Sequence, residues 1–213
     1  MLSRYGRCRA YAASAGGFSL LELMIVVAII GVLAAISIPM SGNAIRYAKI
    51  SGDARDISNG IAVAKMRAAA KFTQARVYFD LAGKTFKIDT CDVPATVPCP
   101  SWTIDTNNGL TSLSSTVSFG YSPVTTPPAN TQTAIGQAAL CKNNASPPVD
   151  VTGTACVIFN SRGIPVTPAG SPTGDYAIYV QDVTFCYAIT VAATGFIRVW
   201  RTNVVATPTW ALQ

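Results

Sequence analysis

GGFSLLELMIVVAIIGVLAAISIP, residues 16–39, is the stretch of sequence that best predicts the fold and the function of this chain. It begins with small residues and continues as an apolar run with a single carboxylate, Glu22, which is also the only glutamate in the chain. From Leu23 to Met40 no residue is charged, and a run of this length is about what a helix needs to cross a bilayer. The pattern therefore predicts a transmembrane helix over residues 18–40.

Residues 1–17, which precede this helix, carry Arg4, Arg7 and Arg9 and end in small residues. In an ordinary secretory signal the apolar stretch comes before the cleavage site and is removed with it, whereas here it follows the small residues. By the positive-inside rule, the basic leader stays cytoplasmic and the rest of the chain is exported. A plain signal anchor would explain the apolar run and the arginines equally well. Glu22 argues against it, because a lone carboxylate in an apolar helix is costly without a partner.

Five positions of this segment resemble the type IV pilins and the type II secretion pseudopilins: Gly17 before the cleavage site, Phe18 after it, then Glu22, Gly31 and Pro39. The resemblance implies that a prepilin peptidase cleaves between Gly17 and Phe18 and that Phe18 is N-methylated. It also implies storage in the bacterial inner membrane as a single-pass protein, with the globular domain on the periplasmic or extracellular side. The implied partners are other pilin or pseudopilin subunits and an inner-membrane assembly platform. In the filament, Glu22 is expected to pair with the amino group of Phe18 on a neighbouring subunit.

Residues 41–72 are expected to continue the helix in amphipathic form. Small and apolar residues recur there at spacings of three and four, which is the helical period: Ala54, Ile57, Ile61, Ala64 and Ala68. Charged residues lie between them. Such a stripe is expected to pack on a β-sheet. Because proline removes a helical hydrogen bond, a bend or a local break is expected at Pro39, where the apolar part of the helix ends.

Residues 73–213 form the predicted globular domain, in which β-branched residues and period-two alternation replace the helical pattern. Residues 75–81 and 84–89 are expected to form a hairpin that turns at Ala82 and Gly83. Further strands are expected at residues 115–121, 155–160, 176–183, 185–191 and 196–205. The fold class predicted is α+β, with the long N-terminal helix packed on an antiparallel β-sheet.

The composition argues against an enzyme. The chain contains no histidine, so a Ser-His-Asp triad, a Cys-His dyad and a histidine-ligated zinc site are excluded. Four aspartates, Asp80, Asp89, Asp92 and Asp105, could in principle gather into a carboxylate site, but their spacing is irregular and solvated turn positions explain them better. No catalytic residue, cofactor or metal is therefore expected. The formal net charge of +6 includes the three leader arginines and does not by itself indicate nucleic acid.

The cysteines indicate an exported protein with structural disulfides. Cys8 lies in the leader, and an odd number of cysteines follows it. The local pairs Cys91 with Cys99 and Cys141 with Cys156 are the disulfide candidates, since each would close a loop rich in proline or asparagine. Cys186 lies in an apolar run and is expected to be a small buried side chain. No CxxC pair exists, which makes a redox site or a zinc knuckle improbable.

The C-terminal stretches CVIFNSRGIPV, DYAIYVQDV and YAITVAATGFIRVWR resemble the GspH and FimT type of minor pilin or pseudopilin. Some FimT-like proteins bind DNA through a Gly-Arg-x-Arg hairpin, and here Arg198, Trp200 and Arg201 follow Gly195. Strand alternation, however, places Arg198 and Trp200 on one face and Arg201 on the other. Two hypotheses stay open. The first is a structural minor subunit of a type IV pilus or type II secretion pseudopilus, and the second is a minor pilin that binds DNA or another extracellular ligand.

Overall fold

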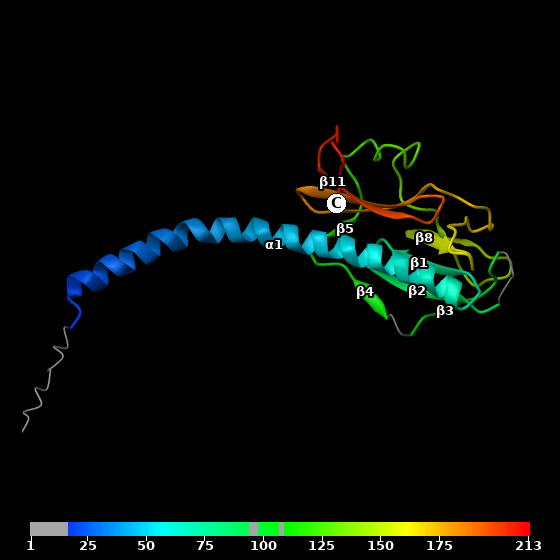
Figure 1. The fold of residues 1–213 in the computed structure, drawn as a ribbon, viewed down its shortest axis with the longest axis horizontal. Coiled ribbons are helices and arrows are strands. Elements are labelled where there is room, and N and C mark those ends of the chain that lie inside the picture. The colour runs from blue at the N-terminus through cyan, green and yellow to red at the C-terminus, as the bar shows by residue number, and fades with distance from the viewer. Residues whose placement is uncertain (1–16, 94–97, 107–108) are drawn as a thin grey trace, which may run out of the picture. The chain divides into compact units, whose positions relative to one another are not determined.

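The computed structural model describes residues 17–93, 98–106 and 109–213, except for the side chains of residues 36–41. One long helix, α1 (Leu20–Ala70), is followed by the strands β1 to β12 (Figure 1). The chain divides into two units, residues 1–43 and residues 44–213. Within the described ranges, no helix is both long and apolar enough to cross a membrane, so the transmembrane role of residues 18–40 remains a prediction.

The second unit contains two antiparallel five-stranded sheets and a short ribbon. Sheet A has the order β3-β2-β1-β8, with β4 also paired to β2. Its strands are β1 (Ala75–Asp80), β2 (Thr85–Cys91), β3 (Trp102–Ile104), β4 (Leu110–Ser112) and β8 (Thr154–Phe159). Sheet B has the order β12-β11-β10-β9-β5. Its strands are β5 (Ser118–Phe119), β9 (Tyr176–Gln181), β10 (Phe185–Val191), β11 (Ile197–Asn203) and β12 (Ala211–Leu212). The ribbon pairs β6 (Cys141–Lys142) with β7 (Asp150–Val151).

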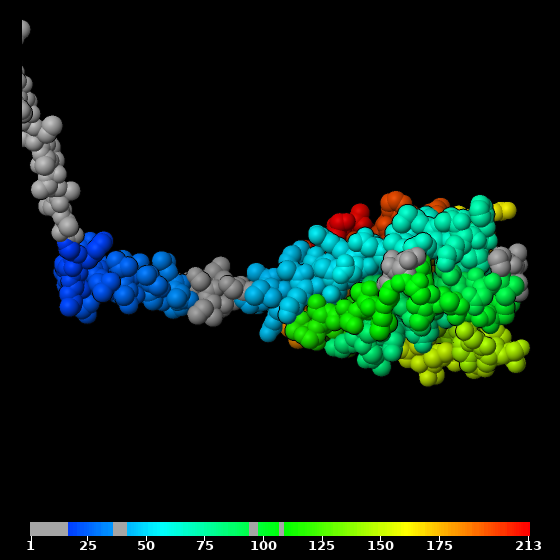
Figure 2. Space-filling view, turned by 90° about the horizontal axis from the view of Figure 1, so that it is seen from below, coloured from blue at the N-terminus to red at the C-terminus, as the bar shows by residue number. Residues whose placement is uncertain are grey.

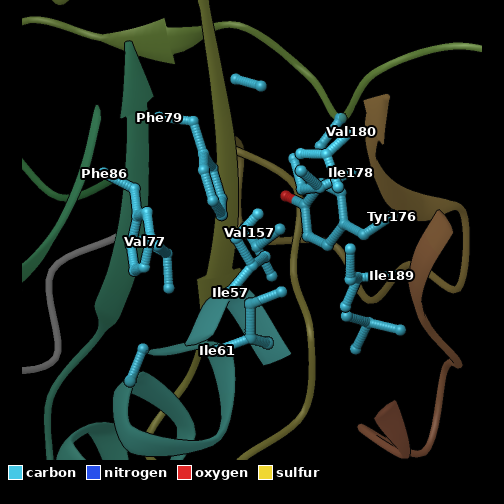
Figure 3. Close-up of a cluster of buried hydrophobic side chains, with 14 of the residues drawn as sticks. Ile57, Ile61, Val77, Phe79, Phe86, Val157, Tyr176, Ile178, Val180 and Ile189 are labelled. Atoms are coloured by element: carbon cyan, nitrogen blue, oxygen red, sulfur yellow. The ribbon is translucent and has the colours of Figure 1, made fainter. Parts of the chain in front are cut away.

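The central core of this unit lies where α1 meets the inner faces of both sheets. The helix contributes the predicted apolar stripe, and all five of its members, together with Ile50, are fully buried: Ala54, Ile57, Ile61, Ala64 and Ala68. Figure 3 shows Ile57 and Ile61 pointing toward Val77 and Val157 of sheet A and Ile189 of sheet B. Burying these side chains removes apolar surface from water, which is the main force that holds the helix to the sheets.

The prediction of one sheet is therefore wrong in this respect, although the α+β class is confirmed. β8 pairs antiparallel with β1, in the register Val77 to Val157, and so extends the first hairpin instead of joining the later strands. The strands that follow residue 175 form the second sheet with β5. Strand patterns in the sequence predict which segments are extended, but pairing between distant strands depends on tertiary packing, which a single sequence does not display.

The predicted strands are found with small shifts at their ends. β10 has the predicted bounds, and the first hairpin forms in the register Asp80 to Thr85, with a turn over residues 81–84. The Asp80 carboxylate accepts a hydrogen bond of 2.8 Å from the Gly83 N–H, and Lys84 adopts a positive φ of 54°. The strand expected at 115–121 is reduced to β5. Five short strands, β3, β4, β6, β7 and β12, were not predicted, because two or three residues show no alternation.

An ion pair is buried on the outer face of sheet A. The Arg76 guanidinium lies 2.9 Å and 3.0 Å from Asp89 Oδ2 through its Nη2 and Nε, and donates a hydrogen bond of 2.7 Å to the Lys142 carbonyl. Its Cζ lies 4.4 Å from the centre of the Trp102 ring and 5.3 Å from that of Tyr78. This arginine therefore ties the ribbon to sheet A.

Two further apolar clusters cover the outer faces of the sheets. The disulfide cluster on sheet A consists of Cys91, Cys99, Trp102, Cys141, Cys156, Ile158 and Val166. The tyrosine cluster on sheet B consists of Val124, Ala177, Tyr179, Cys186 and Ala188, with Tyr121, Ile135, Trp200, Val204 and Trp210 packed against them. Because β8 faces the central core on one side and the disulfide cluster on the other, all its residues are buried.

Two polar contacts hold the segment between β3 and β5 against α1. The buried Asp53 carboxylate accepts hydrogen bonds from the Ser114 N–H at 3.0 Å and from its hydroxyl at 3.1 Å. Arg67 pairs with the buried Asp105 at 2.8 Å. Figure 2 shows this segment in green along the cyan part of the helix. The helix is therefore fixed to this segment at two points along its length.

Candidate processing and assembly site

The predicted cleavage site lies just before the helix begins. Gly17 and Phe18 are exposed and have no helical assignment, and 84% of the Phe18 surface is accessible. The first helical residue is Leu20, so the Gly17–Phe18 peptide bond lies outside α1. A bond in this position can be cut without breaking any helical hydrogen bond.

Ser19 caps the helix, and the sequence interpretation had missed it. Its hydroxyl accepts a hydrogen bond of 3.4 Å from the Glu22 N–H, and its carbonyl accepts one of 3.2 Å from Leu23. A serine that receives the N–H of the third helical residue satisfies one of the donors that every helix leaves open at its start. The signal was present, since Ser-x-x-Glu is the sequence pattern of a capping box.

Glu22 lies in the first turn of α1. A carboxylate there is favoured by the partial positive charge at the N-terminal end of a helix. None of the ion pairs found among the described residues includes Glu22. The geometry thus leaves the carboxylate on an exposed helix surface, next to the predicted new amino terminus.

The first part of α1 exposes its apolar side chains in all directions. Every described residue from Gly17 to Ala35 is exposed, including Leu20 at 77% and Leu33 at 59%. A helix that is apolar all round is normally buried, whether in a large core or in a membrane. Over residues 17–35, which the structure describes in full, this apolar surface is exposed.

Gly31 and Pro39 are the other two predicted assembly positions. A Cβ atom built on Gly31 would meet nothing within 4 Å, so no neighbour within its own chain requires a glycine there. Its predicted role in assembly remains a prediction. Pro39 belongs to residues 36–41, whose side chains lie outside the described part, and the bend expected there also remains a prediction.

Both predicted disulfides are present. Cys91 is bonded to Cys99 and Cys141 to Cys156, with S–S distances of 2.00 Å. Cys186 is a free thiol buried in the tyrosine cluster, as its apolar surroundings predicted. Burial raises the pKa of this thiol to about 12, so it is protonated at neutral pH and is a poor nucleophile.

The three candidate DNA-binding residues do not converge. Trp200 packs in the tyrosine cluster and donates its indole N–H to Thr190, whereas Arg201 reaches the Tyr47 hydroxyl of α1 at 3.2 Å. Arg198 is exposed and lies 5.4 Å from the centre of the Phe196 ring. The alternation expected from the sequence therefore holds, and the two arginines lie on opposite faces of β11.

The four aspartates considered as a carboxylate site are engaged separately. Asp80 accepts the turn N–H, Asp89 pairs with Arg76, Asp105 pairs with Arg67, and Asp92 accepts a hydrogen bond of 2.7 Å from the Ser101 hydroxyl. Across the described ranges, no group of three or more His, Cys, Asp or Glu residues could hold a metal ion. Each of these carboxylates thus has a structural contact of its own.

Comparison with known proteins identifies one segment of the chain. Residues 13–38 match the family model described as the prokaryotic N-terminal methylation motif. No curated protein and no solved structure shows significant similarity to the chain. The match covers the predicted cleavage site, Glu22 and Gly31, and it ends directly before Pro39.

Proposed function

We propose, from the type IV pilin and pseudopilin signal segment at residues 13–38, that this chain is a filament subunit that is stored in the inner membrane and assembled through α1. The motif implies processing by a prepilin peptidase and assembly with other pilin-type subunits. Pilin-type chains have a structural role rather than an enzymatic one. The finer proposal is a minor subunit of a type IV pilus or of a type II secretion pseudopilus, delivered to the filament by an inner-membrane assembly platform.

The observation that carries this proposal is the uncovered apolar surface of residues 18–35. Large side chains such as Leu20, Met24 and Ile30 are each more than half exposed. Apolar burial contributes roughly 25 cal/mol for each Å² removed from water, so leaving this surface in water is unfavourable. Neighbouring α1 helices offer the same kind of surface in the filament, and lipid offers it before assembly.

Apolar packing alone does not set the register between subunits. Glu22 supplies a polar contact within an otherwise apolar surface, and its proposed partner is the methylated amino group of Phe18 on a neighbouring subunit. Removing one member of a buried ion pair leaves the other charge without a partner, which costs on the order of 3–5 kcal/mol. The proposed pair therefore favours one relative position of adjacent helices over all others.

The test is to replace Glu22 with alanine and to follow processing and assembly separately. We expect Glu22→Ala to be cleaved after Gly17 and retained in the membrane fraction, but to be depleted from sheared filaments. The matched control is Asp175→Ala, which removes an exposed carboxylate outside α1 and should assemble normally. Normal incorporation of the Glu22→Ala subunit would show that this carboxylate does not set the register.

The processing step has its own readout. Mass spectrometry of the purified subunit should give a mature chain that begins at Phe18 and carries the mass of one additional methyl group. An intact leader in cells that contain an active prepilin peptidase would contradict the proposal, whatever the outcome for Glu22. Deleting the gene for this chain distinguishes the two kinds of filament. Loss of pili supports a subunit of a type IV pilus, and loss of exoprotein secretion supports a subunit of a type II secretion pseudopilus.

A further inference from the structure

The outer face of sheet A is covered at one end and open at the other. The disulfide cluster and the ribbon cover the end that contains Arg76 and Asp89. Beyond Tyr78 this cover stops, and a cavity of about 340 Å³ lies on the sheet. Its lining comes from four strands, β1 to β4, and consists of Tyr78, Asp80, Thr85, Lys87, Ile104 and Leu110.

The register of the strands explains why these residues face the cavity together. Tyr78 is opposite Lys87 and Asp80 is opposite Thr85 in the β1–β2 ladder, and Leu110 is opposite Lys87 on the other side of β2. Residues that are opposite one another in a sheet share a face, and neighbours two apart along a strand share it too. The cavity floor is thus a square of four polar side chains, with Leu110 beside it.

The polar groups of this square act as hydrogen-bonding partners more than as free charges. Asp80 already accepts the Gly83 N–H, and Lys87 Nζ lies 3.8 Å from Asp89 Oδ1 and 5.0 Å from the centre of the Tyr78 ring. The single cation and the single carboxylate of the lining leave no net charge. Burial raises the pKa of Tyr78, and the charge of Asp80 adds to this rise, so the phenol keeps its proton at neutral pH.

The other wall of the cavity is apolar. Leu110 is 66% exposed and Ile104 is 46% exposed, although both are on the face that carries the polar square. A ligand that fits must therefore present hydroxyl groups on one side and an apolar face on the other. Neither a fully apolar molecule nor a strongly charged one satisfies both walls, because unpaired polar groups and uncompensated charges are both costly to bury.

We infer that this cavity is a binding site for a neutral sugar ring, such as the terminal hexose of a surface glycan. A pyranose has hydroxyl groups that both donate and accept, which suits the Asp80 carboxylate, the Lys87 ammonium and the hydroxyls of Thr85 and Tyr78. Its C–H face packs against Leu110 and Ile104. For a ligand of this size in an open site, a Kd on the order of millimolar is expected. This site lies outside α1 and does not depend on the proposed role in filament assembly.

The test uses saturation-transfer NMR on the full chain in lauryldimethylamine oxide micelles, because maltoside and glucoside detergents would themselves compete. The probes are methyl β-glucopyranoside, methyl β-galactopyranoside, methyl glucuronide and free leucine. We expect saturation transfer to the ring protons of at least one of the two neutral glycosides. Lys87→Gln should weaken it severalfold, whereas Lys84→Gln, on the same hairpin but outside the cavity, should not.

A second variant keeps the test decisive if Lys87→Gln does not fold. Leu110→Trp, at an exposed position, fills the cavity and should abolish the transfer, while Val183→Trp, at a 78% exposed position on another turn, should leave it intact. Three results would overturn the inference. They are no transfer to either neutral glycoside, transfer only to the glucuronide or to leucine, and transfer that survives Leu110→Trp.

Discussion

Arg76 illustrates how one polar side chain organises the outer face of sheet A. It is 5% exposed, and its partners come from three separate segments: Asp89 on β2, Trp102 on β3 and Lys142 on β6. From the sequence, Arg76 is only a charged residue in a strand, and nothing local shows that it will be buried. Its burial follows from the ribbon and the disulfide loops, which close over it only in the folded chain.

The ion pair of Arg76 predicts an asymmetric response to mutation. Arg76→Met removes the two close contacts of the buried Asp89 carboxylate and leaves it only Lys87 at 3.8 Å, so it should lower the free energy of unfolding by up to about 3–5 kcal/mol. The double variant Arg76→Met, Asp89→Leu removes both charges and should recover most of this loss. Urea unfolding of the full chain in detergent, followed by the fluorescence of Trp102, Trp200 and Trp210, measures the free energy of unfolding of the single and the double variant. Arg198→Met, at an exposed arginine, is the control and should change stability by less than about 0.5 kcal/mol.

Asp53 predicts a pH dependence of stability. Burial raises the pKa of this carboxyl in the folded state, and the hydrogen bonds from Ser114 only partly oppose the rise. The folded chain therefore binds the proton at a higher pH than the unfolded chain does. The stability contributed by protonation is complete below the unfolded pKa of about 3.9 and is lost as the pH rises through the folded pKa.

The measurement compares the wild-type chain with Asp53→Asn. The free energy of unfolding of the wild type, minus that of the variant, should increase as the pH falls from about 7 to about 3. Asp175→Asn, at an exposed carboxylate, is carried through the same pH series as the control. A difference for Asp53→Asn that decreases toward low pH would mean that Ser114 stabilises the ionised form more than burial disfavours it.

At the scale of single elements, two of the four glycines in α1, Gly52 and Gly60, are not distinguished by the sequence. A Cβ atom on Gly52 would meet nothing within 4 Å, whereas one on Gly60 would lie 2.8 Å from Phe86 Cε2. Phe86 is buried and packs against Phe79 with ring centres 5.7 Å apart, so a shift of its ring would disturb this contact. Gly60 is thus a packing requirement of the interface between the helix and sheet A, and Gly52 is not.

This difference predicts opposite effects for the same substitution. Gly52→Ala should raise the free energy of unfolding by up to about 1 kcal/mol, because alanine is the better helix former. Gly60→Ala gains the same helix propensity but forces Phe86 to shift, and overpacking of this kind costs about 1–3 kcal/mol. We expect it to be destabilising overall. Thermal unfolding of the two variants side by side decides the matter, and equal stabilisation of both would contradict the close contact with Phe86.

The elements themselves were predictable wherever their signals are local. The stripe of Ala54, Ile57 and Ile61, the hairpin of β1 and β2, and the strand β10 follow from periodicity and turn residues that lie next to one another in the sequence. The short strands β3 and β4 were not predictable, since they form only because β2 offers them a free edge. The Ser19 cap could have been predicted, because its pattern is local.

At the scale of the whole molecule, the division into two sheets was beyond local patterns. The pairing of Val77 with Val157 joins strands that are far apart in the chain, and the contact of Asp53 with Ser114 links the helix to a loop. The N-terminal methylation motif, by contrast, was predictable from residues 16–39 alone. The cavity on sheet A was not, since Tyr78, Ile104 and Leu110 meet only through the register of β1 to β4.

The two disulfides should contribute unequally to the stability of the residues that they tie together. Constraining the unfolded chain is worth about 3 kcal/mol for the loop of 15 residues between Cys141 and Cys156 and about 2.5 kcal/mol for the loop of 8 between Cys91 and Cys99. Replacing each pair with alanines and measuring urea unfolding tests this order. A larger loss for the Cys91 and Cys99 pair would indicate that contacts in the disulfide cluster outweigh loop length.

These cross-links also limit how far the molecule can lengthen under load. If tension unfolds residues 44–213, the chain enclosed by each disulfide stays looped and cannot be drawn out. At roughly 3.4 Å for each extended residue, the two loops together withhold on the order of 80 Å of contour length. When a fibre that contains this subunit is stretched, unfolding of a subunit with intact disulfides would therefore add less length to the fibre than unfolding of a reduced one.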